Sequence, residues 1–358
     1  MSPVKKLTVG LGERRYDILI AEGLLRDLGS LVRPLLSSDG PVAVVTDENV
    51  WGAYSDAASA SLAASGVKFE PIVLPPGEGN KSMSGLATVY DGFAGLGVTR
   101  NGLVIAFGGG VIGDLCGFAA ATWMRGARFV QVPTTLLAQV DSSVGGKTAI
   151  NLPQGKNLAG AFHQPSLVVI DTGLLGTLPD REIKNGMSEV VKYGAIRSES
   201  LFEALGRRPG PELPDVIFEC CRIKGEIVER DERDFGERML LNFGHTLGHA
   251  IERQSGYEGY RHGEAVAFGS VLAASMGERM GVTEPGSAEA LRRTLALHGL
   301  ETDYPGDVSE LLPALASDKK NLGGEVNMVL LRRIGDAFVR RTGLSEIASA
   351  LEGLGRWT

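Results

Sequence analysis

The feature that most constrains this chain is a change of pattern near residue 178. Before it, short apolar runs at 41–50, 67–74, 101–110, 128–135 and 166–173 are interleaved with helical patterns at 52–66 and 81–96. Such alternation is typical of a mostly parallel sheet covered by helices. After it, long helical patterns dominate, at 186–205, 213–230, 239–255, 262–281 and 286–299. The sequence therefore predicts two domains, an α/β domain over 1–178 and an all-α domain over 179–358.

Composition narrows the possible functions. Hydrophobic residues make up 43% and charged residues 22% of the chain, the balance of a globular protein. The net charge of −7 disfavours non-specific binding to nucleic acid. No stretch reaches the ~18 apolar residues of a membrane span, and the three cysteines form neither a disulfide framework nor a CxxC zinc pattern. We therefore expect a cytoplasmic protein with no nucleic-acid or membrane partner.

The turn that follows the apolar run 101–110 favours a phosphate site. Gly108, Gly110 and Gly113 satisfy G-x-G-x-x-G at the start of a helix. Backbone without side chains can approach a phosphate closely, and a helix N-terminus offers free N–H groups. The dinucleotide-binding fingerprint, however, lies in the first strand–helix unit and has an acidic residue ~20 residues after it. This turn has neither property. A tight turn with close packing explains the pattern equally well.

A second glycine-rich segment, DSSVGGKT (141–148), differs from a phosphate-binding P-loop, because Asp141 stands where the first glycine belongs. Lys147, Lys156 and Asn157 flank this polar loop. Two cations and an amide there could bind an anion, and a solvated surface loop is the alternative.

Four polar residues follow apolar runs in the first half. Asp47 and Asn49 end the run 41–50, and Glu78 and Lys81 lie in the turn after the next run. Open α/β sheets place ligand contacts at the carboxyl ends of their strands. Each of the four is a weak indication by itself.

The second half contains a cluster of potential metal ligands. His245, His249 and His262 fall within 18 residues, and the first two share a helix face. Glu189 lies on an otherwise apolar helical segment, where an unpaired carboxylate would be costly. A divalent metal between Glu189 and two histidines would satisfy it, in the His2Glu pattern of catalytic zinc. One ligand plus an acid–base group is the alternative for His245 and His249, and structural histidines are another.

Taken together, these segments resemble the 3-dehydroquinate synthases of the sugar phosphate cyclase group. The resemblance runs from TDENV (46–50) to DKKN (318–321) and is strongest at 108–126, 132–165, 186–194, 241–252 and 262–269. It implies a Rossmann-like domain that binds NAD, a helical domain that binds zinc or cobalt, and a homodimer. It also implies a phosphorus–oxygen lyase that converts the sugar phosphate 3-deoxy-D-arabino-heptulosonate 7-phosphate into 3-dehydroquinate and phosphate, in the shikimate route to aromatic amino acids.

The resemblance also assigns residues. It makes Glu189, His245 and His262 the metal ligands. It places NAD contacts at Asp47, Asn49, Glu78, Lys81, Gly109, Gly110, Asp114, Thr134, Thr135 and Asp141. It places substrate contacts at Arg125, Lys147, Lys156, Asn157, Lys192, Lys224, Arg238, Asn242, His249 and one of Lys319 and Lys320, with Arg125 reaching a neighbouring subunit's phosphate site. Catalytic roles are expected for Lys147, Asn157, Lys192, Asn242 and His249.

The implied mechanism has five steps at one site. A secondary alcohol is oxidised to a ketone by NAD, phosphate leaves by β-elimination, and the ketone is reduced again. The ring then opens, and an intramolecular aldol reaction closes the carbocycle. A metal on the hydroxyl lowers its pKa, and cations hold the two anionic ends of the substrate. No dedicated base for the elimination is evident, so we expect the leaving phosphate to take the proton.

Two other enzyme classes remain as alternatives. An NAD- and metal-dependent alcohol dehydrogenase would share the glycine-rich turn and the metal site, but would not need the lysines and arginines assigned to phosphate. Other sugar phosphate cyclases, such as 2-deoxy-scyllo-inosose or valiolone-forming synthases, act on substrates without a carboxylate. Retention of Asn242, Arg238 and the DKK segment favours the dehydroquinate synthases over them.

Overall fold

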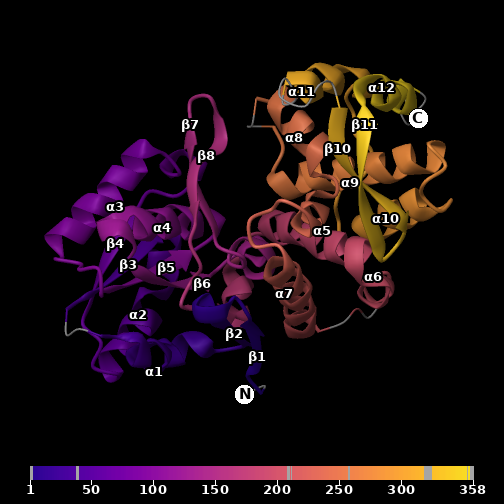
Figure 1. Ribbon diagram of the computed structural model, residues 1–358. Coiled ribbons are helices and arrows are strands. Elements are labelled where there is room, and N and C mark those ends of the chain that lie inside the picture. Colours follow the sequence, from indigo (N-terminus) through magenta and orange to yellow (C-terminus); the bar gives the residue numbers. More distant parts are fainter. Residues whose placement is uncertain are drawn as a thin grey trace. The chain divides into compact units, whose positions relative to one another are not determined.

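The computed structural model describes residues 3–37, 40–207, 210, 212–256, 259–317, 325–352 and 354 (Figure 1). The chain forms two compact units, Met1–Pro179 with Lys224–Glu229, and Asp180–Ile223 with Arg230–Thr358. The sequence-based boundary after residue 178 did not include the return of 224–229 to the first unit. That segment belongs there because Lys224 bonds to Asp141 and Glu229 accepts the Gly10 amide. Among the described residues, no helix has the length and apolar character needed to cross a membrane.

The first unit is built on a seven-stranded sheet of order β1-β2-β9-β6-β5-β3-β4. Its strands are β1 (Lys5–Val9), β2 (Tyr16–Ala21), β3 (Val42–Asp47), β4 (Phe69–Leu74), β5 (Leu103–Gly108), β6 (Arg128–Pro133) and β9 (Leu167–Asp171). β1 pairs with β2 antiparallel, and the other neighbours pair in parallel. The predicted mostly parallel sheet is therefore confirmed, and β3, β4, β5, β6 and β9 occupy the five predicted apolar runs.

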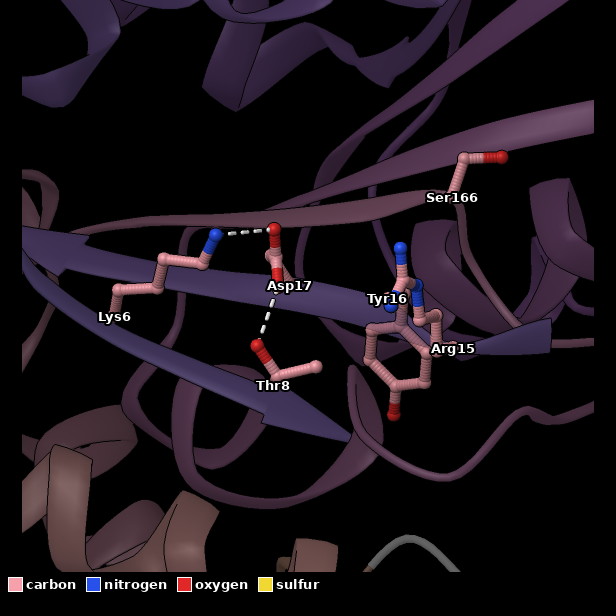
Figure 2. A pocket seen from close by; sticks show the side chains of 6 residues that line it. All are labelled: Lys6, Thr8, Arg15, Tyr16, Asp17 and Ser166. Atoms are coloured by element: carbon pink, nitrogen blue, oxygen red, sulfur yellow. Dashed lines mark hydrogen bonds and ion pairs between the residues drawn. The ribbon is translucent and has the colours of Figure 1, made fainter. Parts of the chain in front are cut away.

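A small polar cavity of about 260 Å³ lies at the edge formed by β1 and β2. In Figure 2, Lys6 and Thr8 of β1 both reach toward Asp17 of β2. The distances to the Asp17 carboxylate are 2.8 Å from Lys6 Nζ and 2.6 Å from Thr8 Oγ1. Burial opposes ionisation of Asp17, but these bonds outweigh it and lower the pKa of Asp17. The cavity contains none of the predicted site residues.

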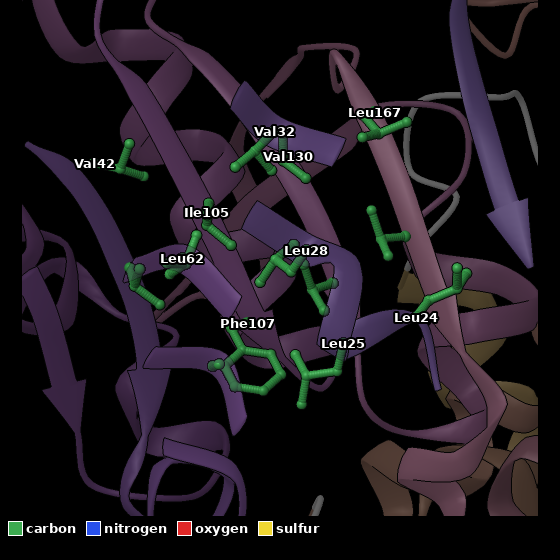
Figure 3. Packing of buried hydrophobic residues seen from close by; sticks show 14 of the residues in the cluster. Leu24, Leu25, Leu28, Val32, Val42, Leu62, Ile105, Phe107, Val130 and Leu167 are labelled. Carbon is green, nitrogen blue, oxygen red and sulfur yellow. The ribbon is translucent and has the colours of Figure 1, made fainter. Parts of the chain in front are cut away.

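Helices cover both faces of this sheet because the strand residues alternate between two cores. Val44, Ile105 and Phe107 pack with α1 (Leu28–Val32) and α2 (Glu48–Ala64), in the cluster of Figure 3. Val45 and Val104 instead pack with α3 (Met83–Gly95) and α4 (Gly110–Thr122). Two-sided burial explains why these strands read as continuous apolar runs.

A hairpin of β7 (Lys147–Leu152) and β8 (Gly155–Phe162) extends from this unit beside α4 (Figure 1). The sequence of this segment indicated only a polar loop. Close packing accounts for the difference: a Cβ on Gly160 would lie 2.3 Å from the Thr148 carbonyl oxygen, and one on Gly117 of α4 would lie 2.4 Å from Thr148 Cγ2. Small residues therefore let two strands and a helix approach one another.

The second unit is mostly helical, as predicted. Its helices are α5 (Asp180–Arg197), α6 (Glu199–Leu205), α7 (Leu213–Arg230), α8 (His245–Gln254), α9 (His262–Arg279), α10 (Ser287–Leu297), α11 (Leu312–Ser317) and α12 (Leu344–Glu352), with α7 shared between the units. The antiparallel hairpin β10 (Glu325–Arg333) and β11 (Asp336–Gly343) corrects the expectation of an all-α domain. β10 buries Val326, Met328, Val329, Leu330 and Leu331, a short and nearly continuous apolar run that suits a strand buried on both faces.

Shorter turns complete the described chain. Single 3-10 turns lie at Gly12–Arg14, Leu24–Asp27, Arg33–Leu35, Glu78–Asn80, Trp123–Arg125, Thr172–Thr177, Glu237–Asn242 and Val308–Leu311, and a π turn lies at Ala138–Ser142.

Candidate metal centre and phosphate-binding turn

The first residues of two helices meet a buried carboxylate in the second unit. Glu189 of α5 is fully buried, and His245 and His262 are the first residues of α8 and α9. The Nε2 atoms of both histidines lie 3.5 Å from Glu189 Oε1. One donor atom from each residue falls within 4.8 Å of the other two. A carboxylate and two imidazole nitrogens that converge in this way fit a divalent metal with an open position for a ligand.

Glycines bring the three helices close enough to form this cluster. A Cβ on Gly269 of α9 would lie 2.1 Å from the Gly244 carbonyl oxygen at the start of α8. A Cβ on Gly263 would lie 2.0 Å from the Asn185 carbonyl oxygen of α5. The Gly263 amide also donates to Asn185 Oδ1 at 2.6 Å, which fixes the beginning of α9 against α5. The histidines are thus positioned by backbone packing.

The electrostatics of the two histidines differ. Burial lowers the pKa of His245 to about 3, so its ring is neutral. Burial also disfavours the charged form of His262, but Glu189 and Glu252 outweigh this effect and raise its pKa to about 9. Lys192, one turn after Glu189, forms a buried ion pair with that carboxylate. The cluster therefore already balances the Glu189 charge with cationic groups, which a bound cation would replace in part.

His249, Arg238 and Asn242 belong to the same unit. The His249 ring is exposed, with its centroid 5.5 Å from that of His245 and 6.1 Å from that of His262. Asn242 ends the 3-10 turn before α8 and is half-buried. Arg238 is buried and donates through Nη1 to the Glu232 carbonyl oxygen. The structure thus brings His249 beside the candidate metal ligands and places Arg238 in the 3-10 turn that precedes α8.

Five of the ten predicted nucleotide contacts lie at the carboxyl ends of three adjacent parallel strands. Asp47 ends β3, Gly109 and Gly110 follow β5, and Thr134 and Thr135 follow β6. Because β4 and β5 lie on opposite sides of β3, the strand order reverses here, which is where open α/β sheets bind ligands.

The backbone at the start of α4 is closely surrounded. A Cβ on Gly109 would lie 3.0 Å from Thr135 Cγ2, and one on Gly110 would lie 3.1 Å from Ser142 Oγ. Gly109 is the N-cap of α4 and supplies no side-chain cap, so the first amides of this helix keep no side-chain partner from that residue. Asp47 instead caps α2, where its carboxylate accepts the amides of Asn49 and Val50 at 3.0 and 3.1 Å.

Charged pairs connect several of the other predicted contacts. Lys81 pairs with Asp114 beside the first turn of α4. Burial raises the pKa of Asp114, against the opposing effect of Lys81. Lys224 Nζ lies 2.7 Å from the carbonyl oxygen and 2.8 Å from Oδ1 of Asp141. Lys224, predicted as a substrate contact, is therefore joined to a predicted NAD contact.

The remaining predicted residues are dispersed. Glu78 and Asn157 are exposed, and both form hydrogen bonds with the Asn151 side chain. Asn151 Nδ2 donates to Glu78 Oε1 at 2.7 Å, and Asn151 Oδ1 accepts the backbone amide of Asn157 at 2.9 Å. Arg125 is exposed with a left-handed φ of 66°. Lys147 is exposed and Lys156 half-buried, both on the β7–β8 hairpin. Lys319 and Lys320 lie outside the described residues.

Two residues at these sites were missed by the sequence analysis. Asn151 links Glu78 to Asn157, and no motif pointed to it. Glu252 is buried on α8 and faces His262, with 3.6 Å between Glu252 Oε1 and His262 Nδ1. Its position three residues after His249 and seven after His245 places it on their helix face, and this spacing could have identified it.

Comparison with known proteins gives a consistent result over most of the chain. The family model for the 3-dehydroquinate synthase N-terminal domain matches residues 71–185, and the model for the C-terminal domain matches residues 186–321. A 3-dehydroquinate synthase of Clostridium perfringens is 46% identical over 95% of this chain and 98% of its own length.

Solved structures of cyclases share the fold. A 2-deoxy-scyllo-inosose synthase, in complex with carbaglucose-6-phosphate, NAD+ and Co2+, is 26% identical with a TM-score of 0.86 and covers 97% of this chain and 100% of its own. The 2-epi-5-epi-valiolone synthase of Streptomyces hygroscopicus, with NAD+ and Zn2+ bound, is 28% identical with a TM-score of 0.83. It covers 99% of this chain and 98% of its own. With both family models matched and close to half of the residues shared with a full-length relative, this chain belongs to the 3-dehydroquinate synthase family of carbocycle-forming enzymes.

Proposed function

We propose that this chain is a lyase that converts 3-deoxy-D-arabino-heptulosonate 7-phosphate into 3-dehydroquinate and phosphate, with NAD, one zinc or cobalt ion and a homodimeric assembly. Because β-elimination of phosphate breaks a carbon–oxygen bond, the enzyme is a carbon–oxygen lyase and not the expected phosphorus–oxygen lyase. The observation that carries the proposal is the buried Glu189 carboxylate facing the Nε2 atoms of His245 and His262, in a chain of this family. The solved relatives with the same fold contain NAD+ together with Co2+ or Zn2+.

When bound, the metal supplies Lewis-acid polarisation of the reacting hydroxyl and ketone, and NAD accepts and returns one hydride. Glu189, His245 and His262 would hold the metal. The glycine-rich start of α4 and the strand ends around Thr134 and Thr135 would hold the pyrophosphate of NAD, since they offer close backbone approach at the reversal of strand order.

The cationic side chains would bind the two anionic ends of the substrate through charge-assisted bonds. Arg238 and Lys192 are buried and held in place by neighbours, so they lose little freedom on binding. Lys147, Lys156 and Asn157 share one hairpin and would act on the phosphate end. His249 is exposed beside the metal cluster and would exchange a proton with bound substrate, while the leaving phosphate removes the proton in the elimination.

A different cyclase activity is the second candidate, because the solved cyclases named above act with the same cofactors. The difference in identity favours the first, at 46% for the dehydroquinate synthase against 26% and 28% for those cyclases. An alcohol dehydrogenase would release NADH in steady state, whereas the proposed reaction regenerates NAD.

The test is a direct assay. Metal-replete protein is incubated with the heptulosonate phosphate and NAD, and phosphate, dehydroquinate and NADH are measured. We expect equal amounts of phosphate and dehydroquinate without accumulation of NADH. Turnover of glucose 6-phosphate in place of the heptulosonate phosphate would favour the other cyclases, and absence of dehydroquinate would refute the proposal.

A further inference from the structure

His245 and His262 both direct Nε2 toward Glu189, while Nδ1 of each ring faces a different group. His245 Nδ1 lies 3.1 Å from the Phe243 carbonyl oxygen. A carbonyl oxygen can only accept, so this nitrogen carries the proton and Nε2 carries the lone pair. In neutral imidazole the partner of one nitrogen decides the state of the other. The backbone thus prepares His245 as a ligand through Nε2.

In His262, by contrast, Nδ1 faces a carboxylate. Glu252 Oε1 lies 3.6 Å from that nitrogen, an ion-pair distance. The Glu252 side chain is 4% exposed, so it is held away from water on α8. A buried carboxylate is costly unless a proton donor faces it, and a ring N–H of His262 is such a donor.

We propose that Glu252 is a positioning residue for the metal centre. Its carboxylate accepts the Nδ1 proton of His262, which fixes the ring orientation and directs Nε2 toward Glu189, where a bound metal would displace the Nε2 proton. This inference rests on the metal site of the proposed function and extends it to a residue outside the ligand set. Carboxylates that hold ligating histidines in this way also increase the basicity of the ring.

A competing arrangement involves the same residues. His249, Glu252 and His262 also bring donor atoms within 4.8 Å of one another, so they could hold a second ion. That ion would need His262 Nδ1 while the first ion needs Nε2. The imidazole of His262 could bind both ions only after losing both of its ring protons. That state is unfavourable compared with a neutral ring whose one N–H is bonded to a carboxylate. The geometry therefore favours one ion and a positioning role for Glu252.

The test measures metal binding independently of catalysis. Metal-free full-length protein is titrated with Zn2+ against a chromophoric chelator, for the wild type, Glu252→Ala, Glu252→Gln and the control Glu278→Gln. Glu278 lies on α9 like His262, and its carboxylate accepts the Ala288 amide at 2.8 Å, so the control makes the same chemical change away from the cluster. We expect Glu252→Ala to weaken Zn2+ binding about 10- to 100-fold, Glu252→Gln to weaken it less, and the control to bind as the wild type.

Cobalt provides a second readout. The visible absorption of Co2+ depends on ligand geometry, so we expect an altered spectrum in Glu252→Ala and an unchanged one in Glu278→Gln. Circular dichroism of the metal-free protein shows whether Glu252→Ala folds. If it does not, the zinc affinity and cobalt spectrum of the isosteric Glu252→Gln test the proposal.

The outcomes separate the two proposals. A wild type that binds no Zn2+ or Co2+ would refute the metal site itself. Wild-type affinity and an unchanged cobalt spectrum in both Glu252 variants would refute only the positioning role. Two ions in the wild type and one in Glu252→Ala would show that Glu252 is itself a ligand, which also overturns the inference.

Discussion

The two units place their functional groups in different surroundings. In the second unit, Glu189 is fully buried, and His245 and His262, which face it, are fixed by helices that touch through glycines. In the first unit, Asn49, Glu78 and Lys147 are exposed at strand ends and on a hairpin. Groups held by packing keep their geometry without a ligand, whereas exposed groups are ordered by the ligand they meet. Substitutions in the second unit should therefore alter stability and metal binding, and those in the first should alter ligand affinity.

The largest expected effect is that of Glu189→Ala. It removes a proposed metal ligand and leaves Lys192 buried without its carboxylate, a change that costs about 3–5 kcal/mol for a buried pair. We expect loss of bound metal and of nearly all turnover, measured by metal analysis and phosphate release. The isosteric Glu189→Gln removes the carboxylate charge without opening a cavity, so it excludes lost packing as the cause of the effect. Full metal content and turnover in Glu189→Gln would contradict the assignment.

Gly269→Ala tests whether packing maintains the metal cluster. The added Cβ would lie 2.1 Å from the Gly244 carbonyl oxygen, so α8 and α9 must separate. We expect the free energy of unfolding, measured with urea, to fall by about 1–3 kcal/mol, together with weaker Zn2+ binding.

The matched substitution in the first unit is Gly110→Ala, whose Cβ would meet the movable Ser142 Oγ at 3.1 Å. There we expect little change in the free energy of unfolding but a Kd for NAD that rises about tenfold, or 1.4 kcal/mol. Equal losses of stability in the two variants would remove the distinction between the units.

His249→Ala examines an exposed residue in the otherwise buried cluster. If the leaving phosphate takes the proton, His249 is not an obligatory base, and kcat should fall by less than the ~10²-fold typical of a lost general base. Zn2+ content should stay that of the wild type, because Glu189, His245 and His262 remain. A loss of turnover as complete as in Glu189→Ala would assign the proton transfer to His249.

The smallest effect concerns Asp231, which accepts the amides of Phe235, Gly236 and Arg238 at 3.1, 2.7 and 3.0 Å. Burial opposes its ionisation, but these bonds outweigh it and lower the pKa of Asp231. A lowered pKa in the folded state stabilises the protein above the unfolded pKa of about 3.9, and this contribution is lost as the pH falls. Asp231→Asn should thus have a slightly lower Tm than the wild type at pH 7, and the difference should disappear in acid. A difference that persists at low pH would exclude the carboxylate charge as its cause.

The sequence by itself determined the parallel sheet, because a strand buried on both faces must be apolar at every position, as in β3 and β5. It also identified Glu189 and the clustered histidines, since a carboxylate in an apolar helix requires a partner. The β7–β8 and β10–β11 hairpins were missed. Their pairing depends on contacts such as Gly160 with Thr148, between segments whose local composition resembles loops or helices.

Tertiary structure alone decided which atoms meet. Residue spacing left open which histidines face Glu189, and the resemblance chose among them without giving a physical reason. The reason lies in the packing of α5, α8 and α9 through Gly244, Gly263 and Gly269, which directs two Nε2 atoms at one carboxylate and leaves His249 exposed. The spacing along α8 places Glu252 on the helix face of His245 and His249, but its contact with His262 depends on how closely α8 and α9 approach each other.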